Sequence, residues 1–168
     1  AAGIQLGASG AIAVDEQQRT NLPQVYAAGD CAEAYHRVLK QPVFIPLGTT
    51  ANKQGKVAGA NAAGAQERFS GIVGTAGFKV FDLEVARTAL GAAGCGRHDL
   101  RGISAVSHSN RRGHRYPGAA RITTLLFAER GSGRLLGAQM VGADVVAKRM
   151  DVLATALHAG MTLADIEA

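Results

Sequence analysis

The last part of the chain carries the clearest periodic pattern of apolar positions. Over residues 144–159 apolar residues recur every three or four positions, with Lys148, Arg149 and Asp151 between them. This period is that of an amphipathic helix whose apolar side faces a core. A further helical start follows at the end of the chain. The apolar side of the predicted helix consists of Val146, Met150, Leu153 and Leu157.

Shorter apolar runs predict a sheet for that helix to cover. Residues 103–108, 122–128 and 135–141 have the length and composition of strands, and Gly131-Ser132-Gly133 between the last two is typical of a hairpin turn. Another short strand is predicted over 78–81. We interpret residues 83–90 as a short helix with Asp82 as its N-cap. The pattern as a whole predicts a sheet packed with helices.

The first part of the chain is organised differently, and we place the joint near Ser70. Two short strands are predicted over 11–14 and 25–28. A helix follows that begins around 48–50, with Thr49 or Thr50 as its N-cap, and ends near Gly64, a residue type favoured just after a helix. Small residues at intervals of three and four along this helix would permit close packing: Ala51, Gly55, Ala58, Gly59, Ala62 and Ala63.

Composition narrows the class of protein. The 168 residues suffice for one compact domain or one and a half. No apolar run could span a bilayer and no signal pattern opens the chain, so we expect a cytoplasmic protein without a membrane partner. Cys31 and Cys95 lie far apart and are expected to be small buried side chains. The five histidines lack metal-ligand spacing, so no metal site is predicted.

The net charge of +5 raises the question of an anionic partner. Between Arg97 and Arg115 the chain holds five arginines and three histidines with few acids, which we interpret as a loop. Such a loop is a solvated surface, a site for an anionic ligand such as a nucleotide phosphate, or a surface for acidic partners. No nucleic acid partner is expected, because no helix-turn-helix, zinc-finger or aromatic stacking pattern accompanies the charge.

Residues 20–30, T-N-L-P-Q-V-Y-A-A-G-D, are the most informative stretch. A turn leads into a short apolar run that ends at Gly29 and Asp30. Glycine permits the close approach of another group or a positive φ, and a carboxylate accepts hydrogen bonds from hydroxyls and amides. This combination predicts a strand end that faces a ligand.

The same residues carry a resemblance to a known family. T-x5-Y-A-A-G-D, continued by C-A-E and by I-P-L-G-T-T-A-N-K-Q-G over 45–55, resembles the FAD-dependent pyridine nucleotide-disulfide oxidoreductases, and among them the coenzyme A-disulfide reductase and NADH oxidase branch. The resemblance implies an α+β fold. Residues 1–69 would be the C-terminal part of an FAD-binding α/β domain. Residues 70–168 would be a dimerisation domain of mixed antiparallel sheet packed with helices, truncated at its C-terminus.

The family also implies parts that this chain does not show. A dinucleotide fingerprint needs G-x-G-x-x-G between a strand and a helix, but Gly94-Cys95-Gly96 is followed by Asp99 where the third glycine should be. We therefore interpret the chain as the C-terminal fragment of a larger flavoprotein, inactive alone. The resemblance implies that the larger protein passes electrons from NAD(P)H through FAD to a disulfide such as coenzyme A disulfide, to a peroxide or to oxygen.

The resemblance implies two groups of cofactor-binding residues. Gly29 and Asp30 would hold the ribityl-phosphate part of FAD. Leu47, Gly48 and Thr49 would lie against the flavin pyrimidine, where the N–H groups and dipole of a helix start favour negative charge. An ordinary capped helix that covers a sheet is the alternative interpretation of the second group.

Tyr116 is the implied catalytic residue. It stands in Tyr116-Pro117-Gly118, and coenzyme A-disulfide reductases use a tyrosine in this setting to assist thiol chemistry in the active site of the partner subunit. A tyrosine hydroxyl can donate a proton or orient a thiolate. The assembly implied is a homodimer with a small disulfide or peroxide substrate. A tyrosine at a strand edge before a turn is the alternative.

A second class of function stays open on the residues alone. The same fold could serve as a non-enzymatic dimerisation module, or it could bind an anionic ligand through the arginine stretch. Hydrolase chemistry is not predicted, because nothing in the sequence brings a nucleophile near a base.

Overall fold

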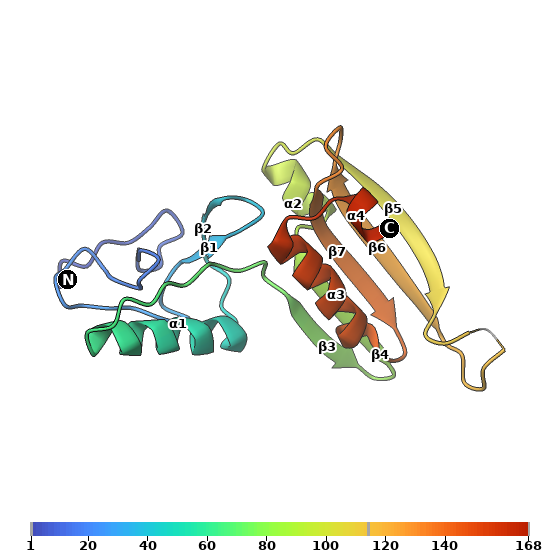
Figure 1. The fold of residues 1–168 in the computed structure, drawn as a ribbon, viewed down its shortest axis with the longest axis horizontal. Helices are drawn as coiled ribbons and strands as arrows, with labels where there is room; N and C mark the ends of the chain where they lie inside the picture. The colour runs from blue at the N-terminus through green and yellow to red at the C-terminus, as the bar shows by residue number, and fades with distance from the viewer. Residues whose placement is uncertain (1, 114, 168) are drawn as a thin grey trace. The chain divides into compact units, whose positions relative to one another are not determined.

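The computed structural model describes residues 2–113 and 115–167, which belong to two compact units (Figure 1). The first unit extends to Ile72 and the second begins at Val73.

The first unit is built around one long helix, α1 (Gly48–Ala62). Beside it runs mostly irregular chain with a two-stranded antiparallel sheet, β1 (Ala34–His36) and β2 (Gln41–Val43). The strands predicted over 11–14 and 25–28 are wrong. These runs form only isolated bridges, from Ile12 to Leu6 and Ala32 and from Tyr26 to Arg19. A strand requires partners over several consecutive residues, and the described chain supplies each run with single pairs.

The start of α1 differs from the prediction, whereas its end agrees with it. The helix begins at Gly48, so Leu47 is its N-cap and neither threonine can serve as the cap. Among the described residues no side chain caps this helix start. At the other end Gly64 takes a φ of +97°. Its N–H donates to Asn61 O at 3.0 Å and that of Ala65 donates to Ala60 O at 3.0 Å, the Schellman pattern that favours glycine.

The inward face of α1 is polar. Thr50, Gln54 and Asn61 are its buried residues, while Gly55 and Gly59 of the predicted close-packing face are exposed in the described unit. Asn61 shows how this face is held. Its side-chain amide donates to Gln17 O and Glu67 O at 2.9 Å each and accepts from Glu67 N at 2.7 Å. Hydrogen bonds to neighbouring backbone thus replace an apolar stripe on this helix.

The second unit is a five-stranded antiparallel sheet with the strand order β3-β4-β7-β6-β5. Helix α3 lies along one face of it (Figure 1). The strands and helices of this unit are β3 (Ala76–Val80), β4 (Leu83–Ala89), α2 (Ala92–Arg97), β5 (Gly102–Asn110), β6 (Arg121–Glu129), β7 (Leu135–Gly142), α3 (Val146–Ala159) and α4 (Leu163–Glu167).

Four predicted strands and the amphipathic helix are confirmed, but the helix predicted over 83–90 is wrong. That segment is strand β4, which pairs with β3 on one side and β7 on the other. Ala86 and Thr88 point into the core while Arg87 between them is exposed, which is the period of a strand. Two neighbouring strands with free edges outweigh the local helical signal of Asp82 and Glu84.

The core of the second unit lies between α3 and the sheet. The predicted apolar side of α3 faces it, with Val146 and Met150 almost completely buried and Leu153 partly so. Ile122 and Leu136 are completely buried. The central cluster consists of Ala86, Ile122, Ala138, Met140, Val146 and Met150. No helix within residues 2–113 and 115–167 has the length and apolar character to cross a membrane.

Candidate functional site

Two of the predicted site segments meet in the first unit. Gly29 has a φ of +80°, and a Cβ built on it would lie 3.2 Å from the Cβ of Ala51 in the first turns of α1. The Gly29 N–H donates to Oε1 of Gln54 at 2.9 Å. A side chain at position 29 would therefore both strain the backbone and crowd the helix. The structure thus brings the Gly29–Asp30 turn against the helix that starts after Leu47.

The start of α1 presents unused backbone donors. Gly48 and Thr49 are exposed, Leu47 is half-buried, and no side chain of the described residues caps the helix. The first N–H groups of a helix have no partner inside it, and the helix dipole adds partial positive charge there. The first turn also lacks an acidic residue. This end of α1 can therefore accept a negatively charged or hydrogen-bond-accepting group.

Asp30 lies beside this helix start with its carboxylate exposed. Among the described residues it makes no side-chain hydrogen bond or ion pair, so its oxygens can accept bonds from a ligand. Cys31, the next residue, is exposed with its Sγ 3.4 Å from Ala28 O, and the prediction that it is buried is wrong. The turn that exposes Asp30 exposes its neighbour as well.

Gln54 is the residue that sequence reasoning missed. Its side chain is completely buried, and its Nε2 donates to Glu33 O at 2.9 Å while its Oε1 accepts from Gly29. It therefore fixes the chain on both sides of Asp30. Its spacing gives one indication of this position, because Gln54 follows Thr50 by four residues and therefore lies on the same side of the helix.

Glu33 also contributes to this arrangement. Its buried carboxylate accepts from the N–H and the Oγ of Ser9, at 3.2 Å and 2.5 Å. A Cβ at Gly7 would lie 2.0 Å from Oε2 of Glu33, so only glycine leaves room for this carboxylate. The segment after Asp30 is thereby fastened to the start of the chain as well as to α1.

Tyr116 belongs to the second unit, in the segment between β5 and β6 that we call the 111–120 loop. Its side chain is 57% exposed. The guanidinium carbon of Arg112 lies 4.7 Å from the centre of its ring. The backbone around it is turned, with Tyr116 N donating to Gly113 O at 2.8 Å and Ala119 N donating to Tyr116 O at 3.1 Å. These two backbone hydrogen bonds form turns on either side of the tyrosine, whose side chain is exposed.

The interpretation of the whole Arg97–Arg115 stretch as one loop is wrong. Nine of its residues form β5, so Arg97 and Arg101 lie at one end of that strand and Arg111 to Arg115 at the other, about 30 Å apart at ~3.3 Å per residue. The strand predicted over 103–108 is therefore confirmed, and it interrupts this stretch. His114, which was counted in the stretch, lies outside the described residues.

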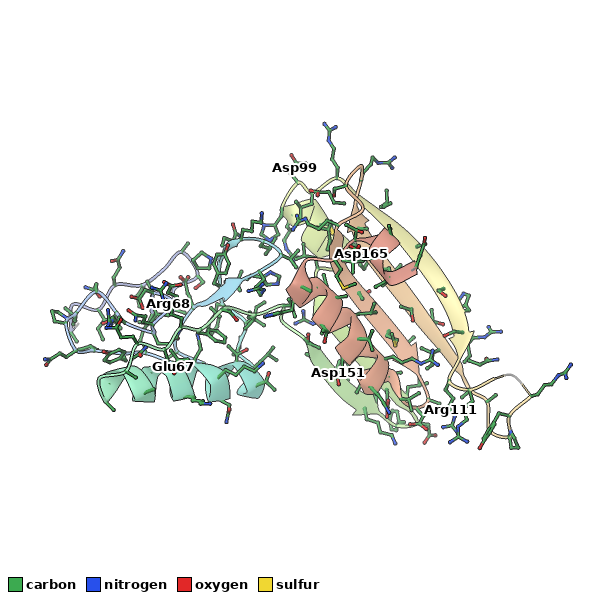
Figure 2. All side chains as sticks on the ribbon, viewed as in Figure 1. Glu67, Arg68, Asp99, Arg111, Asp151 and Asp165 are labelled. Atoms are coloured by element: carbon green, nitrogen blue, oxygen red, sulfur yellow. The ribbon has the colours of Figure 1, made fainter. Side chains whose placement is uncertain are left out.

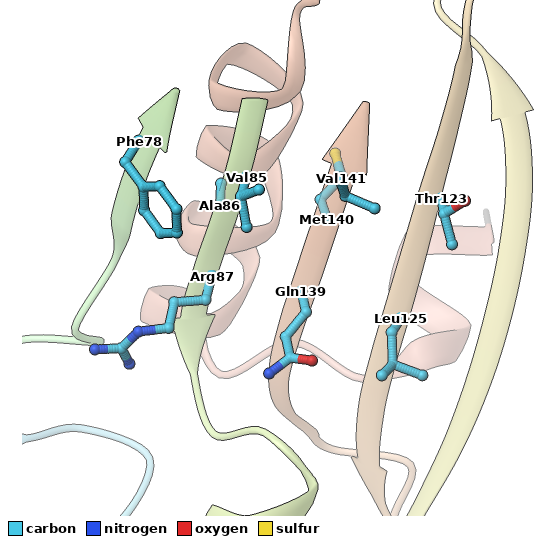
Figure 3. A pocket seen from close by; sticks show the side chains of 9 residues that line it. All are labelled: Phe78, Val85, Ala86, Arg87, Thr123, Leu125, Gln139, Met140 and Val141. Atoms are coloured by element: carbon cyan, nitrogen blue, oxygen red, sulfur yellow. The ribbon is translucent and has the colours of Figure 1, made fainter. Parts of the chain in front are cut away.

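A shallow hollow of about 450 Å³ lies on the sheet of the second unit. Figure 3 shows Phe78, Val85, Leu125 and Val141 projecting from the side of the sheet away from α3. Phe78 is 59% exposed, so this face is apolar and open within the unit. None of the predicted site residues lines it.

The described residues contain no group of three or more histidine, cysteine or acidic side chains placed to hold a metal ion. Cys95 is buried, and burial raises the pKa of its thiol, an effect that a hydrogen bond from its own backbone partly opposes. A neutral buried thiol is a poor nucleophile.

Comparison with protein families decides what these units are. Residues 1–66 match the model described as pyridine nucleotide-disulphide oxidoreductase, and residues 75–168 match the dimerisation domain of the same family. The chain belongs to the pyridine nucleotide-disulphide oxidoreductase family. The motif resemblance that the Gly29–Asp30 turn carries is thus confirmed, and so is the α+β fold class.

Individual members of the family are similar over nearly the whole chain. A NAD(P)H coenzyme A polysulfide/persulfide reductase from Pyrococcus horikoshii is 37% identical over 163 residues, which is 97% of this chain and 36% of that protein. The structure of a NAD-dependent persulfide reductase from A. fulgidus is 43% identical with a TM-score of 0.94, and the match covers 98% of this chain and 30% of that one. A FAD-dependent pyridine nucleotide-disulphide oxidoreductase from Desulfovibrio vulgaris is 32% identical, with a TM-score of 0.85 over 98% of this chain and 39% of that one. The chain thus spans less than two fifths of each of these three relatives.

Proposed function

We propose that this chain is the C-terminal part of a flavoprotein that passes electrons from NAD(P)H through FAD to a small disulfide or persulfide. Peroxide and oxygen are the alternative acceptors. The observation that carries the proposal is the approach of the Gly29–Asp30 turn to the uncapped start of α1, which Gln54 fastens. The coenzyme A persulfide reductase among the relatives supports a thiol-derived substrate.

The residues present fit one part of FAD. Gly29 has no side chain to obstruct a ligand, and the exposed carboxylate of Asp30 can accept hydrogen bonds from ribityl hydroxyls. The N–H groups of Gly48 and Thr49 would face the electron-rich edge of the ring system, with Leu47 packed beside it. Bound FAD would supply the two-electron chemistry. The chain's own contribution is to position the cofactor and to place positive potential at the helix start.

Flavin affinity tests this assignment. In the complete polypeptide that carries these residues, we expect Asp30→Asn to weaken FAD binding about tenfold, the loss of one charge-assisted hydrogen bond. The measurement is quenching of flavin fluorescence on titration of the apoprotein. Asp82→Asn is the control, because Asp82 is an exposed carboxylate in the turn after β3. Equal FAD affinity in the Asp30 variant and the wild type would contradict the assignment.

The proposed assembly is a homodimer formed through the second unit. The family match to a dimerisation domain over residues 75–168 supports it. Light scattering on the 168-residue chain across a dilution series measures the molar mass directly. A dimeric mass that persists on dilution is the expected result. A monomer at every concentration would show that residues 73–168 do not suffice for the contact.

We assign Tyr116 to the active site of the partner subunit, where its hydroxyl would donate a proton to the departing thiolate or orient it. The outward exposure of its side chain supports this role. We expect Tyr116→Phe to lower kcat for disulfide reduction roughly 10- to 100-fold while reduction of the flavin by NAD(P)H keeps its rate. Tyr35→Phe, at a tyrosine that is 46% exposed in β1, is the control. Unchanged turnover in Tyr116→Phe would contradict a role of this tyrosine in the active site.

A further inference from the structure

We propose that Arg111 is a positioning residue for Tyr116, and that Asp144, between β7 and α3, holds Arg111 in place. The inference rests on the proposed function, in which the Tyr116 hydroxyl acts on the departing thiolate. The side chain of Tyr116 is largely exposed, so no core packs around it. Its position must therefore come from the backbone of the 111–120 loop and from the groups that hold that backbone.

Tyr116 occupies the first position of a tight turn. The Ala119 N–H donates to Tyr116 O at 3.1 Å, Pro117 stands at the second position, and Gly118 at the third has a φ of +73°. These are the residue preferences of a type II turn, in which proline fixes the second φ and glycine permits the positive third one. The direction in which the tyrosine leaves the backbone therefore depends on the shape of this turn.

Arg111 holds the turn from across the loop. It lies directly after β5 (Figure 2), and its Nε donates to Gly118 O at 2.8 Å while its backbone N–H donates to Ala120 O at 2.8 Å. A Cβ built on Gly118 would lie 3.2 Å from Nη2 of Arg111, so the guanidinium packs closely against the turn. Arg111 therefore fixes the carbonyl of Gly118, two residues after Tyr116.

Asp144 orients the Arg111 side chain. One carboxylate oxygen forms an ion pair with the guanidinium, and the other accepts from the Val145 N–H at 2.7 Å. The Val146 N–H at the start of α3 donates to Oε2 of Glu84 on β4 at 2.9 Å. Two carboxylates thus hold the start of α3, and one of them also holds the arginine of the loop. The loop is thereby tied to the helix that covers the sheet.

Arg149 on α3 supports the same arrangement from the β5 side. Its guanidinium donates to Ser109 Oγ and Asn110 O at 3.0 Å each and to Arg111 O at 3.3 Å. Both the backbone and the side chain of Arg111 are therefore held by residues in or next to α3. A guanidinium can make these several bonds at once because its donors lie in a fixed plane.

Arg112 is the alternative positioning residue. Its guanidinium carbon lies 4.7 Å from the centre of the Tyr116 ring. The residue is exposed, however, and its guanidinium makes no hydrogen bond or ion pair within residues 2–113 and 115–167. An exposed cation–π contact is weak and does not fix a mobile side chain. The bonded Arg111 is therefore the better candidate.

Fluorine NMR of the 168-residue chain labelled with 3-fluorotyrosine tests the proposal directly. The chain has three tyrosines, Tyr26, Tyr35 and Tyr116. The signal of the last is assigned by its loss in Tyr116→Phe. We expect Arg111→Lys to move the Tyr116 signal towards the position of the free amino acid and to leave the other two in place. Lysine keeps the charge beside Asp144 but has no donor at the Nε position, so the bond to Gly118 O is lost.

Two further variants separate the contacts. Asp144→Asn should move the same signal, because the asparagine keeps an oxygen for the Val145 N–H but loses the ion pair with Arg111. Arg130→Lys is the matched control, because Arg130 is exposed just after β6, at the end of that strand remote from the loop, and should leave all three signals unchanged. Circular dichroism of each variant confirms that it is folded.

Turnover of the complete polypeptide that carries these residues tests the consequence for the reaction. We expect Arg111→Lys to lower kcat for disulfide reduction about three- to tenfold, while KM and the rate of flavin reduction by NAD(P)H are kept. In the Tyr116→Phe background the same substitution should have no further effect, because it acts through the tyrosine hydroxyl.

Three results would overturn the proposal. An unchanged Tyr116 signal in Arg111→Lys would show that the turn keeps its shape without the bond to Gly118 O. A shift of that signal in Arg112→Gln alone would transfer the role to Arg112. A loss of kcat in Arg111→Lys that persists in the Tyr116→Phe background would show that the arginine acts elsewhere.

Failure of the proposed function is separable, because it is measured by turnover of Tyr116→Phe alone. Normal turnover in that variant would reject the catalytic role of the tyrosine. The fluorine signal does not depend on activity, so it would still decide whether Arg111 positions the Tyr116 side chain.

Discussion

The side-chain amide of Gln54 joins the Gly29 N–H to the Glu33 carbonyl, accepting from the first and donating to the second at 2.9 Å each. It does so from a fully buried position on α1. Gln54 therefore holds the turn that exposes Asp30 through one hydrogen bond before Asp30 and one after it. A buried amide with both ends satisfied stabilises this turn in one conformation, since any other would leave two polar groups without partners.

Replacing Gln54 should release that turn. We expect Gln54→Met to lower the free energy of unfolding of the first unit by about 2–4 kcal/mol, because the Gly29 N–H and the Glu33 carbonyl both lose their partner in a buried site. Amide hydrogen exchange at Gly29 should accelerate in parallel. Gln66→Met, the same change at an exposed position, is the control and should stay within about 0.5 kcal/mol of wild type. Unaltered exchange at Gly29 in Gln54→Met would show that the clamp is dispensable.

Gly137 should tolerate no side chain. A Cβ built there would lie 2.0 Å from Leu90 O and 2.5 Å from Leu90 N, so the backbone of Leu90 would have to move. That backbone is itself held, because Leu90 N donates to Leu136 O at 3.1 Å. We expect Gly137→Ala to destabilise the second unit by about 3 kcal/mol in urea unfolding.

Gly96 provides the matched substitution. It lies in α2 with nothing within 4 Å of its built Cβ, so Gly96→Ala should be neutral or stabilising by up to ~1 kcal/mol. Similar effects of the two substitutions would contradict the close approach of β7 to Leu90.

Some of this structure was predictable from the sequence because the signal is local. The spacing of Val146, Met150 and Leu153 indicates α3, and the Gly-Ser-Gly turn indicates the β6–β7 hairpin, without reference to any other segment. Residues 83–89 misled because an acidic cap signal is also local, whereas β7, one of the two strands that pair with them, contributes partners 48 to 58 residues further along the chain. Local propensity is weak where such a partner is present.

The residues of the candidate site were likewise predictable only where a local motif contains them. Gly29, Asp30 and the start of α1 were identifiable because a recurrent motif contains them. Gln54 was not, because its partners lie 21 and 25 residues away and a glutamine inside a helix is ordinarily exposed. The different contacts of the neighbours Arg111 and Arg112 could not be predicted either. Arg111 forms an ion pair with Asp144, whereas the guanidinium of Arg112 lies over the Tyr116 ring.

The two cysteines should differ sharply in reactivity. Cys31 is exposed, whereas Cys95 is buried and burial raises the pKa of its thiol, so a thiol reagent should reach Cys31 first and find little thiolate at Cys95. Titration with an aromatic disulfide reagent should show one fast and one slow thiol, and denaturant should make both fast. Cys31→Ser should abolish the fast phase and Cys95→Ser should leave it intact. Loss of the fast phase in Cys95→Ser instead would place the reactive thiol in α2.

The last helix should loosen in acid. One carboxylate oxygen of Asp165 accepts from the N–H and the Oγ1 of Thr162 at 2.7 Å each, and the Asp165 N–H donates back to Thr162 Oγ1 at 3.3 Å. This reciprocal pair is a capping box at the start of α4. The backbone bond, followed by the side-chain bond, holds the pKa of Asp165 below its usual value because both favour the ionised form.

The direction of the pH effect follows from that lowered pKa. The stabilisation of α4 is fully present above the unfolded-state pKa, about 3.9, and is lost as the pH falls through the lower pKa of the folded state. The Thr162 amide resonance, followed by NMR, should therefore titrate with a midpoint below that of an unperturbed aspartate. Asp165→Asn should remove the titration, since its amide oxygen accepts hydrogen bonds without ionising. A midpoint at or above the ordinary aspartate value would mean that the box does not favour the carboxylate.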